Sequence, residues 1–295
     1  MQSFKSGVCA IIGAPNAGKS TLLNQILGKK IAAESPKPQT TRGKILGILT
    51  DPETQIIFTD TPGWHKPKNK LGEYMQKSAH SALNDADCVI LTVPVNRSPD
   101  QSAVEKLKNC GAPVILALTK VDLISKPDIL TEMNKYRNDF EHIVPVSALK
   151  AENVGELVAC VKQFLPLGPK YFPDDEITDQ SERQIMAEII REKALLTLSD
   201  EVPHGLAVEI SAFTPRVGID LTDVEATIYC EKESHKGIII GKGGASLKKI
   251  GSLARTDAQK LIGRKIFLTL WVKVKKDWRE NDVLIKNFGF DMKKL

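Results

Sequence analysis

Residues 13–20 have the types and the spacing of a phosphate-binding loop, Gly-Ala-Pro-Asn-Ala-Gly-Lys-Ser. In this G-x-x-x-x-G-K-S pattern, successive backbone N–H groups converge on the β-phosphate, the Lys19 amine reaches the β- and γ-phosphates, and the Ser20 hydroxyl binds Mg²⁺. A glycine turn in an ordinary strand–turn–helix unit is the competing interpretation. The pattern therefore predicts a site for a nucleoside triphosphate.

The residues on either side of this loop predict the elements that must hold it. Residues 8–12 form an apolar run typical of a buried strand, and residues 19–27 combine helix-forming types with apolar Leu22 and Leu23. A strand would then lead into the loop. The N-terminus of the following helix would add its dipole to the attraction for phosphate.

A second candidate group follows an expected antiparallel hairpin, whose strands cover 45–49 and 55–59 around turn residues at 51–54. Its second strand ends in D-x-x-G, with Asp60 and Gly63. A carboxylate at this place can hold Mg²⁺ through water, and the Gly63 N–H can meet a γ-phosphate. We therefore expect both residues at the catalytic site with Lys19.

Strand and helix patterns alternate through the rest of the first half, which predicts an α/β domain with a mostly parallel, doubly wound sheet. Further strands are expected at 87–93, 113–118 and 143–146, and helices near 101–109, 128–138 and 154–164. The loops 119–122, T-K-V-D, and 147–150, S-A-L-K, each follow one of these strands. Because ligands bind at the carboxyl ends of such strands, both loops are candidates for the nucleotide site.

The chain carries five motifs in a fixed order: the phosphate loop, a threonine in the 29–43 loop, D-x-x-G, T-K-x-D and S-A-L. This series resembles the motifs of translation-factor-related GTPases. The resemblance implies that Asp122 accepts hydrogen bonds from guanine, that the Ala148 N–H contacts guanine O6, and that Lys120 covers the base. Thr119 stands where the family usually has Asn. The nucleotide-binding residues implied are Gly13, Asn16, Ala17, Gly18, Lys19, Ser20, Thr21, Thr119, Lys120, Asp122, Ser147, Ala148 and Leu149.

Trp64 follows D-x-x-G at the position where many switch GTPases carry a glutamine that orients the attacking water. An indole cannot take that role, so hydrolysis needs another group. The sequence is similar here to GTPases with a hydrophobic residue at this place, in which an asparagine corresponding to Asn16 ligates K⁺ and stabilises charge between the β- and γ-phosphates. A role for Asn16 in capping the turn is the alternative. We expect slow hydrolysis that is faster in K⁺ than in Na⁺.

Three prolines within 165–173 interrupt regular structure and predict a linker. The expected organisation is a first domain at 1–165, a linker at 166–180, and a second domain with a C-terminal tail at 181–295. Residues 171–231 carry 4 basic and 14 acidic side chains, a net charge of −10, whereas residues 232–279 carry 13 basic and 3 acidic, a net charge of +10. The basic stretch predicts an anionic partner, with a solvated basic face as the alternative.

The second half carries Gly241-Lys242-Gly243-Gly244 between two helical patterns. The expected order is a helix from about 182 to 199 after capping residues at 179–182, strands at 205–213 and 224–232, the two helices, and a strand at 265–275. This order resembles a type II KH domain, a smaller α+β fold that clamps about four unpaired nucleotides along a G-x-x-G loop. The apolar faces predicted include Leu196 on the first helix and Leu253 on the helix after the loop.

The RNA-binding residues implied by the KH resemblance are Gly241, Lys242, Gly243, Gly244 and Lys248. A helix–helix turn without a ligand is one alternative. A second phosphate loop is the other, and it lacks the required G-K-S/T.

A GTPase joined to a type II KH domain resembles the Era family of ribosome-assembly GTPases over nearly the whole chain. The resemblance implies binding of GTP or GDP together with Mg²⁺, and K⁺ is the further ion expected at Asn16. It also implies binding to the 3′ end region of 16S rRNA and a role in assembly of the 30S subunit. The nucleotide state would control access to RNA. The resemblance further implies that Thr41, rather than Thr40, binds Mg²⁺ with Ser20 and Asp60. An RNA-binding module with a vestigial nucleotide site and a signalling or membrane-associated GTPase are the rival functions.

The composition argues against a membrane-spanning, secreted, disulfide-bonded or zinc-binding protein. The 295 residues are 42% hydrophobic, yet no apolar run approaches the roughly 20 residues of a membrane span. The first seven residues lack the apolar core of a secretory signal. Five widely spaced cysteines are expected to be reduced, and the five histidines show no zinc-ligand spacing. We expect a cytoplasmic monomer, with peripheral association at the inner membrane left open.

Overall fold

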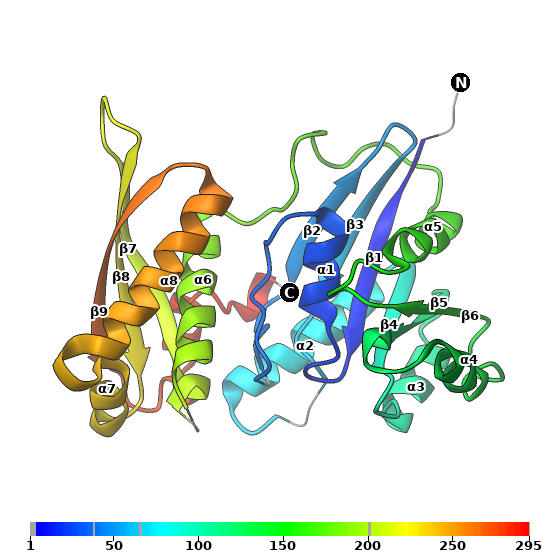
Figure 1. Ribbon diagram of the computed structural model, residues 1–295, viewed down its shortest axis with the longest axis horizontal. Helices are drawn as coiled ribbons and strands as arrows, with labels where there is room; N and C mark the ends of the chain where they lie inside the picture. The colour runs from blue at the N-terminus through cyan, green and yellow to red at the C-terminus, as the bar shows by residue number, and fades with distance from the viewer. Residues whose placement is uncertain (1–3, 38, 65–66, 200–201, 295) are drawn as a thin grey trace. The chain divides into compact units, whose positions relative to one another are not determined.

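The computed structural model describes residues 4–37, 39–64, 67–199 and 202–294. Residues 1–3 and His65, which entered the sequence predictions, lie outside this part. The chain forms two compact units (Figure 1). The first comprises Met1–Ala32, Thr41–Lys66 and Met75–Asp179, and the second Ala33–Thr40, Pro67–Tyr74 and Gln180–Leu295. The domain boundaries at 165 and 181 remain a prediction, but two short segments of the first half pack with the second unit.

The first unit contains a sheet that, within the described residues, has six strands in the order β2-β3-β1-β4-β5-β6. Only the β2–β3 pair is antiparallel, and this confirms the predicted hairpin. The strands are β1 (Lys5–Gly13), β2 (Ile45–Thr50), β3 (Thr54–Asp60), β4 (Cys88–Pro94), β5 (Val114–Thr119) and β6 (His142–Val146). The helices of the first half are α1 (Lys19–Leu27), α2 (Lys70–Asn84), α3 (Gln101–Lys108), η1 (Val121–Leu123), α4 (Lys126–Asn134) and α5 (Val154–Phe164).

Alternate residues of β1 point to opposite faces of this sheet, and each face has its own core. Cys9 and Ile11 pack with residues of α1 and α5, whereas Ala10 and Ile12 pack with residues of α2 and α3. All four side chains are fully buried. Because a parallel strand covered on both faces must be apolar at every position, the run at 8–12 confirms the prediction of a doubly wound domain.

Helix α2 has no counterpart among the predicted elements. Its buried residues Leu71, Met75, Ala79 and Ala82 follow one another at intervals of four, four and three, which is a helical period. The signal was therefore present in the sequence. From the sequence we assigned no element to this segment.

The predicted linker is bound to the sheet of the first unit. The Gln55 side-chain oxygen accepts hydrogen bonds from the backbone N–H groups of Tyr171 and Phe172 at 2.7 and 3.0 Å. Its amide nitrogen donates to the Phe172 carbonyl at 2.8 Å, and the Thr178 hydroxyl donates to the Leu46 carbonyl at 2.7 Å. These contacts satisfy backbone groups that an irregular segment would otherwise leave to water.

The second unit contains a sheet whose described strands lie in the order β7-β8-β9, with β7–β8 antiparallel and β8–β9 parallel. The helices α6, α7 and α8 contribute to one core against this sheet. This order of helix, two strands, two helices and strand confirms the predicted KH topology. The elements are α6 (Glu182–Thr197), η2 (Val202–Gly205), β7 (Ala207–Pro215), β8 (Leu221–Cys230), α7 (Glu233–Ile240), η3 (Lys242–Gly244), α8 (Ala245–Ile262), β9 (Lys265–Val274), η4 (Trp278–Glu280), α9 (Asp282–Asn287) and η5 (Met292–Lys294).

Two predicted core positions are wrong. Leu196 of α6 is 48% exposed and Leu253 of α8 is 41% exposed. The buried stripe of α8 runs through Ile250, Ala254 and Ala258 at intervals of four, and its small alanines let the helix approach its neighbours closely. Leu253 lies beside this stripe rather than on it.

Three of the five cysteines, Cys9, Cys88 and Cys230, are buried, and all five are free. Burial raises the pKa of the Cys9 thiol well above its usual value, and neighbouring Cys88 raises it further. Such thiols are unreactive core residues.

Among the described helices, none combines the length and the apolar character that crossing a membrane requires.

Candidate nucleotide and RNA sites

The phosphate loop lies between the end of β1 and the start of α1. A Cβ atom on Gly13 would lie 2.3 Å from the Thr92 hydroxyl oxygen, so only glycine fits there. Gly18, just before the helix, has a left-handed φ of 94°. The α1 N-terminus thus presents its N–H groups to the loop, which is the arrangement expected of an anion site.

Lys19 is buried, and its amine donates to the carbonyl oxygens of Gly13 at 3.3 Å and Ala14 at 3.0 Å. Burial lowers the pKa of this amine, while the charge of Asp60 opposes the shift. Among the described residues, the hydrogen-bond partners of this amine are therefore carbonyl oxygens of the loop. A phosphate oxygen would be a stronger partner for it.

Three predicted metal ligands converge beside the loop. The Ser20 hydroxyl donates to Asp60 Oδ2 at 2.6 Å and lies 2.8 Å from Thr41 Oγ1, and the Thr41 hydroxyl donates to the same carboxylate oxygen at 3.2 Å. The hydroxyl of Thr40 instead donates to the Lys37 carbonyl at 2.7 Å.

The environment of the Asp60 carboxylate shows whether these residues fit Mg²⁺. Its Oδ1 atom is buried and has no hydrogen-bond partner among the described residues. Burial raises the pKa of this carboxyl, and the charge of Lys19 with the two hydroxyl donors opposes the shift. A buried, unsatisfied carboxylate oxygen beside two hydroxyls is a set of hard oxygen ligands, which Mg²⁺ prefers. The residues therefore fit this ion.

Gly63 and Trp64 follow the D-x-x-G motif along the loop. A Cβ atom on Gly63 would lie 2.7 Å from the Pro15 nitrogen, so its backbone lies directly against the phosphate loop. The backbone N–H of Trp64 donates to the Gly13 carbonyl at 3.3 Å. The Trp64 ring stacks on His80, with centroids 6.3 Å apart, and the amine of Lys106 lies 5.8 Å from the indole.

The predicted base-reading residues lie at the ends of β5 and β6. The Ser147 hydroxyl donates to Asp122 Oδ1 at 2.5 Å, which orients that carboxylate. The Thr119 hydroxyl donates to the Ala17 carbonyl at 2.8 Å, so the residue that departs from the family's asparagine connects β5 to the phosphate loop. Lys120 has a left-handed φ of 61°, and Leu149 is 78% exposed.

The Gly241–Gly244 loop joins α7 to α8 in the second unit. Three of its residues have φ in the left-handed region, at 73° for Gly241, 59° for Gly243 and 80° for Gly244. Lys242 and Lys248 are exposed. The loop borders a groove of about 420 Å³ whose lining residues are Gly244, Leu247, Lys248, Gly251, Ser252, Arg255, Leu268 and Leu270.

This groove combines an apolar floor from Leu268 and Leu270 of β9 with Lys248 and Arg255 of α8. Unstacked bases need an apolar surface and their phosphates need cations, so the combination suits single-stranded nucleic acid. Ser252 and Arg255 were not among the predicted RNA-binding residues. They follow Lys248 by four and seven positions, a helical spacing that could have identified them.

Comparisons with known proteins agree with a GTPase domain and a KH domain in this chain. Residues 8–120 match the family model described as 50S ribosome-binding GTPase, and residues 201–279 match the model of the KH domain. GTPase Era of Alkaliphilus oremlandii is 51% identical over 294 residues, covering 98% of this chain and 100% of the relative. GTPase Era of Ruminiclostridium cellulolyticum is 50% identical over 297 residues, with 99% of each chain covered.

Two solved structures are similar over almost the whole length. One is Era in complex with MgGDPNP and nucleotides 1506–1542 of 16S ribosomal RNA, with a TM-score of 0.94, 39% identity, and coverage of 98% of this chain and 100% of that one. The other is a variant of Aquifex aeolicus Era bound to GDP·AlF4⁻, with a TM-score of 0.94, 38% identity and the same coverage. With this identity along its whole length, the chain belongs to the family of Era GTPases.

Proposed function

We propose that this protein is a GTP-hydrolysing switch that binds the 3′ region of 16S rRNA and assists assembly of the 30S subunit. The observation that carries the proposal is the presence, in one chain, of the Ser20–Thr41–Asp60 cluster beside a phosphate loop and of a basic groove beside a G-x-x-G loop. The Era relative that binds MgGDPNP and 16S rRNA supports the same pairing of ligands.

In the proposed site, Lys19 and the backbone N–H groups of the loop hold the phosphates, and the Gly63 N–H meets the γ-phosphate. Ser20, Thr41 and Asp60 hold Mg²⁺, which when bound neutralises charge on the β- and γ-phosphates. The geometry of Thr41, rather than Thr40, supports its choice as the third ligand.

Specificity for guanine rests on the second group of residues. Asp122, oriented by Ser147, accepts from guanine N1–H and the exocyclic amine, and Lys120 covers the base. The Ala148 N–H contacts guanine O6 beside Leu149. Thr119 keeps Ala17, and with it the phosphate loop, at a fixed distance from these base-reading groups.

Hydrolysis requires a group that stabilises charge between the β- and γ-phosphates, because the Trp64 ring stacks on His80 and has no acceptor for water. A K⁺ ion ligated by Asn16 supplies this charge in our proposal. Turnover measured in matched potassium and sodium buffers tests it: faster turnover in K⁺ is expected, and equal rates would exclude the ion.

On the RNA side, Gly241, Lys242, Gly243 and Gly244 hold the backbone of a single strand, and Lys248 contacts its phosphates along the groove. The glycines let the strand approach closely. We place the protein in the cytoplasm as a monomer, and peripheral contact with the inner membrane is a further part of this proposal.

The test of the whole proposal is GTP turnover with and without a single-stranded RNA matching the 3′ end of 16S rRNA. Stimulation by this RNA is expected, with no stimulation by an RNA of the same composition in scrambled order. Equal turnover in all three samples would contradict a coupled GTPase and RNA-binding protein.

A further inference from the structure

Within the described residues of the segment 33–40, Glu34, Lys37 and Thr40 contact helix α6 or its C-cap residue, although segment and helix are far apart in the sequence. The Glu34 N–H donates to Glu192 Oε2 at 3.0 Å, the Lys37 amine donates to the carbonyl of Leu198, the C-cap residue of the helix, and Arg191 Nη2 donates to the Thr40 carbonyl. Segment and helix belong to the same compact unit. Two side chains of α6 therefore hold the backbone at Glu34 and at Thr40.

Two of the side chains that make these contacts, Arg191 and Glu192, are charged and buried, and so is the adjacent Lys193. Arg191, Glu192 and Lys193 are only 2%, 2% and 7% exposed. Burying charges costs free energy even when they are paired, and apolar residues of similar size often give equal or greater stability. Stability alone therefore does not account for three consecutive buried charges on one helix.

Each of these charges is oriented by a further partner. The Arg191 Nε donates to Glu188 Oε1 at 3.0 Å, one turn earlier on α6. Glu192 Oε1 accepts from the Lys193 amine at 2.7 Å, and the same amine pairs with Asp257 of α8. Since α8 also carries Lys248 and Arg255 of the groove, the network is continuous from the proposed RNA-binding helix to the segment 33–40.

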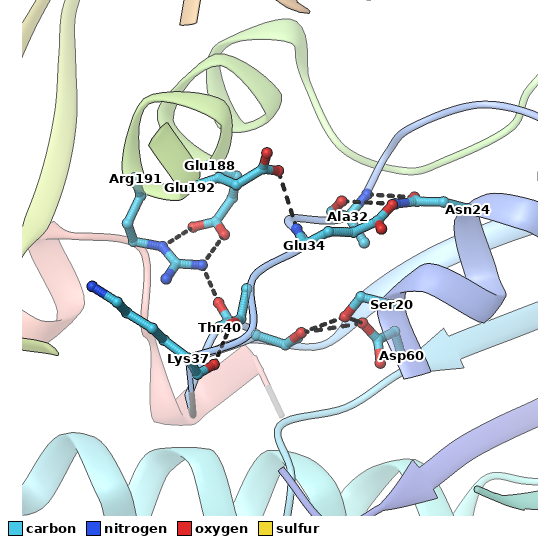
Figure 2. A network of polar contacts seen from close by, with 11 residues as sticks. Ser20, Asn24, Ala32, Glu34, Lys37, Thr40, Asp60, Glu188, Arg191 and Glu192 are labelled. Atoms are coloured by element: carbon cyan, nitrogen blue, oxygen red, sulfur yellow. Dashed lines mark hydrogen bonds and ion pairs between the residues drawn. The ribbon is translucent and has the colours of Figure 1, made fainter. Parts of the chain in front are cut away.

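The segment ends where the metal ligands begin. Arg191 contacts the carbonyl of Thr40, and the next residue, Thr41, places its hydroxyl 2.8 Å from Ser20 Oγ and 3.2 Å from Asp60 Oδ2 (Figure 2). Consecutive Cα atoms are about 3.8 Å apart across a planar peptide, so a shift of the Thr40 carbonyl must move Thr41.

We propose that Arg191 and Glu192 are positioning residues for Thr41, through which helix α6 sets the geometry of the nucleotide site. The inference rests on the proposed role of Thr41 as a ligand of the Mg²⁺ that accompanies GTP. It assigns to the KH unit a part in hydrolysis itself. Neither residue is among the proposed ligands of the nucleotide or the metal; Arg191 acts through the Thr40 carbonyl and Glu192 through the Glu34 N–H.

The experiment compares Arg191→Met and Glu192→Gln with Thr41→Ala, and uses Arg183→Met as a matched control, since Arg183 is an exposed residue of the same helix. The affinities for GDP and for a non-hydrolysable GTP analogue, together with kcat, are measured on the full chain with Mg²⁺. We expect Arg191→Met to lower kcat about tenfold and to lower the affinity for the analogue relative to GDP about fivefold, because only the triphosphate state uses Thr41.

A merely structural role would lower both affinities together, so an unchanged ratio of the two in Arg191→Met overturns the proposal. Arg191→Lys retains one donor for the Thr40 carbonyl and should recover most of kcat. If Arg191→Met does not fold, Glu192→Gln, which keeps the side-chain size, carries the test by the same ratio.

Thr41→Ala separates this inference from the proposed function. A loss in Thr41→Ala with no change in Arg191→Met and Glu192→Gln overturns the positioning role alone. No change in Thr41→Ala would overturn the metal role of Thr41 and the inference with it.

Discussion

The two glycine-containing loops, 13–20 and 241–244, are both proposed to meet phosphate, yet they are built in opposite ways. The first is enclosed: Lys19 is buried, Gly13 leaves no room for a Cβ beside Thr92, and Gly63 lies against Pro15. The second is open: Lys242 is exposed, and a Cβ on Gly243 or Gly244 would meet no atom within 4 Å.

This difference follows from the ligands. A nucleoside triphosphate has one shape and binds as a unit, so a few preorganised contacts in a water-poor site can carry most of the affinity. A nucleic acid strand passes through its site, so many exposed contacts of small energy add up and depend on salt. Removing one contact of the enclosed loop should therefore lower ligand affinity strongly, whereas removing one contact of the open loop should lower it only slightly.

The largest effect is expected for Lys19→Ala. In the proposed site the amine makes charge-assisted hydrogen bonds to two phosphates, each worth about 1.5–3 kcal/mol, so GTP affinity should fall by at least about 100-fold. Titration with a fluorescent GTP analogue measures it, and a thermal melt shows whether the variant is folded. A folded variant that binds within threefold of the parent would contradict the enclosed character of this site.

An intermediate effect is expected inside the open loop, from a matched pair of glycines. Gly241→Ala places a Cβ 3.0 Å from the Ser246 nitrogen at φ 73° and ψ 172°, a region that only glycine adopts readily, which costs about 1–3 kcal/mol. Gly243→Ala at φ 59° and ψ 23° meets open space and should cost about 1 kcal/mol. Urea denaturation compares them, and equal losses of stability would show that the loop is not anchored at Gly241.

The smallest effect is expected for Lys242→Ala. Loss of one phosphate contact should weaken RNA binding a few-fold and lower the slope of log affinity against log salt by about 0.7. Lys276→Ala is the matched control, since Lys276 is also exposed but lies outside the Gly241–Gly244 loop. An equal change of slope in both variants would mean that the basic face binds RNA without using the loop.

Residues close in sequence allowed most of the fold to be predicted. The apolar run at 8–12, the loop after it and the D-x-x-G strand end are local patterns, and they placed Lys19, Ser20 and Asp60 correctly beside one another. The capping residues before α6 were likewise recognised, and Ser181 forms a capping box with Gln184.

The rest depended on contacts that no local pattern encodes. Charged residues in a helix usually face water, so Arg191 and Glu192 gave no sign that they are buried against residues 34–40. Helical spacing places Arg255 on the same side of α8 as Lys248, but only the packing of α8 beside β9 shows that this side meets Leu268 and Leu270 in a groove. Leu253 was misplaced because a helical period alone does not fix the exact edge of the buried stripe.

In the proposed switch, the nucleotide bound at the enclosed loop 13–20 controls the affinity of the open loop 241–244 for RNA. The direct measurement is the affinity of the full chain for the 3′-end RNA of 16S rRNA, titrated at one salt concentration with saturating GDP and with a non-hydrolysable GTP analogue. We expect tighter binding with the analogue, by about 5- to 150-fold if the coupling has the usual size. Identical affinities in the two nucleotide states would contradict the account.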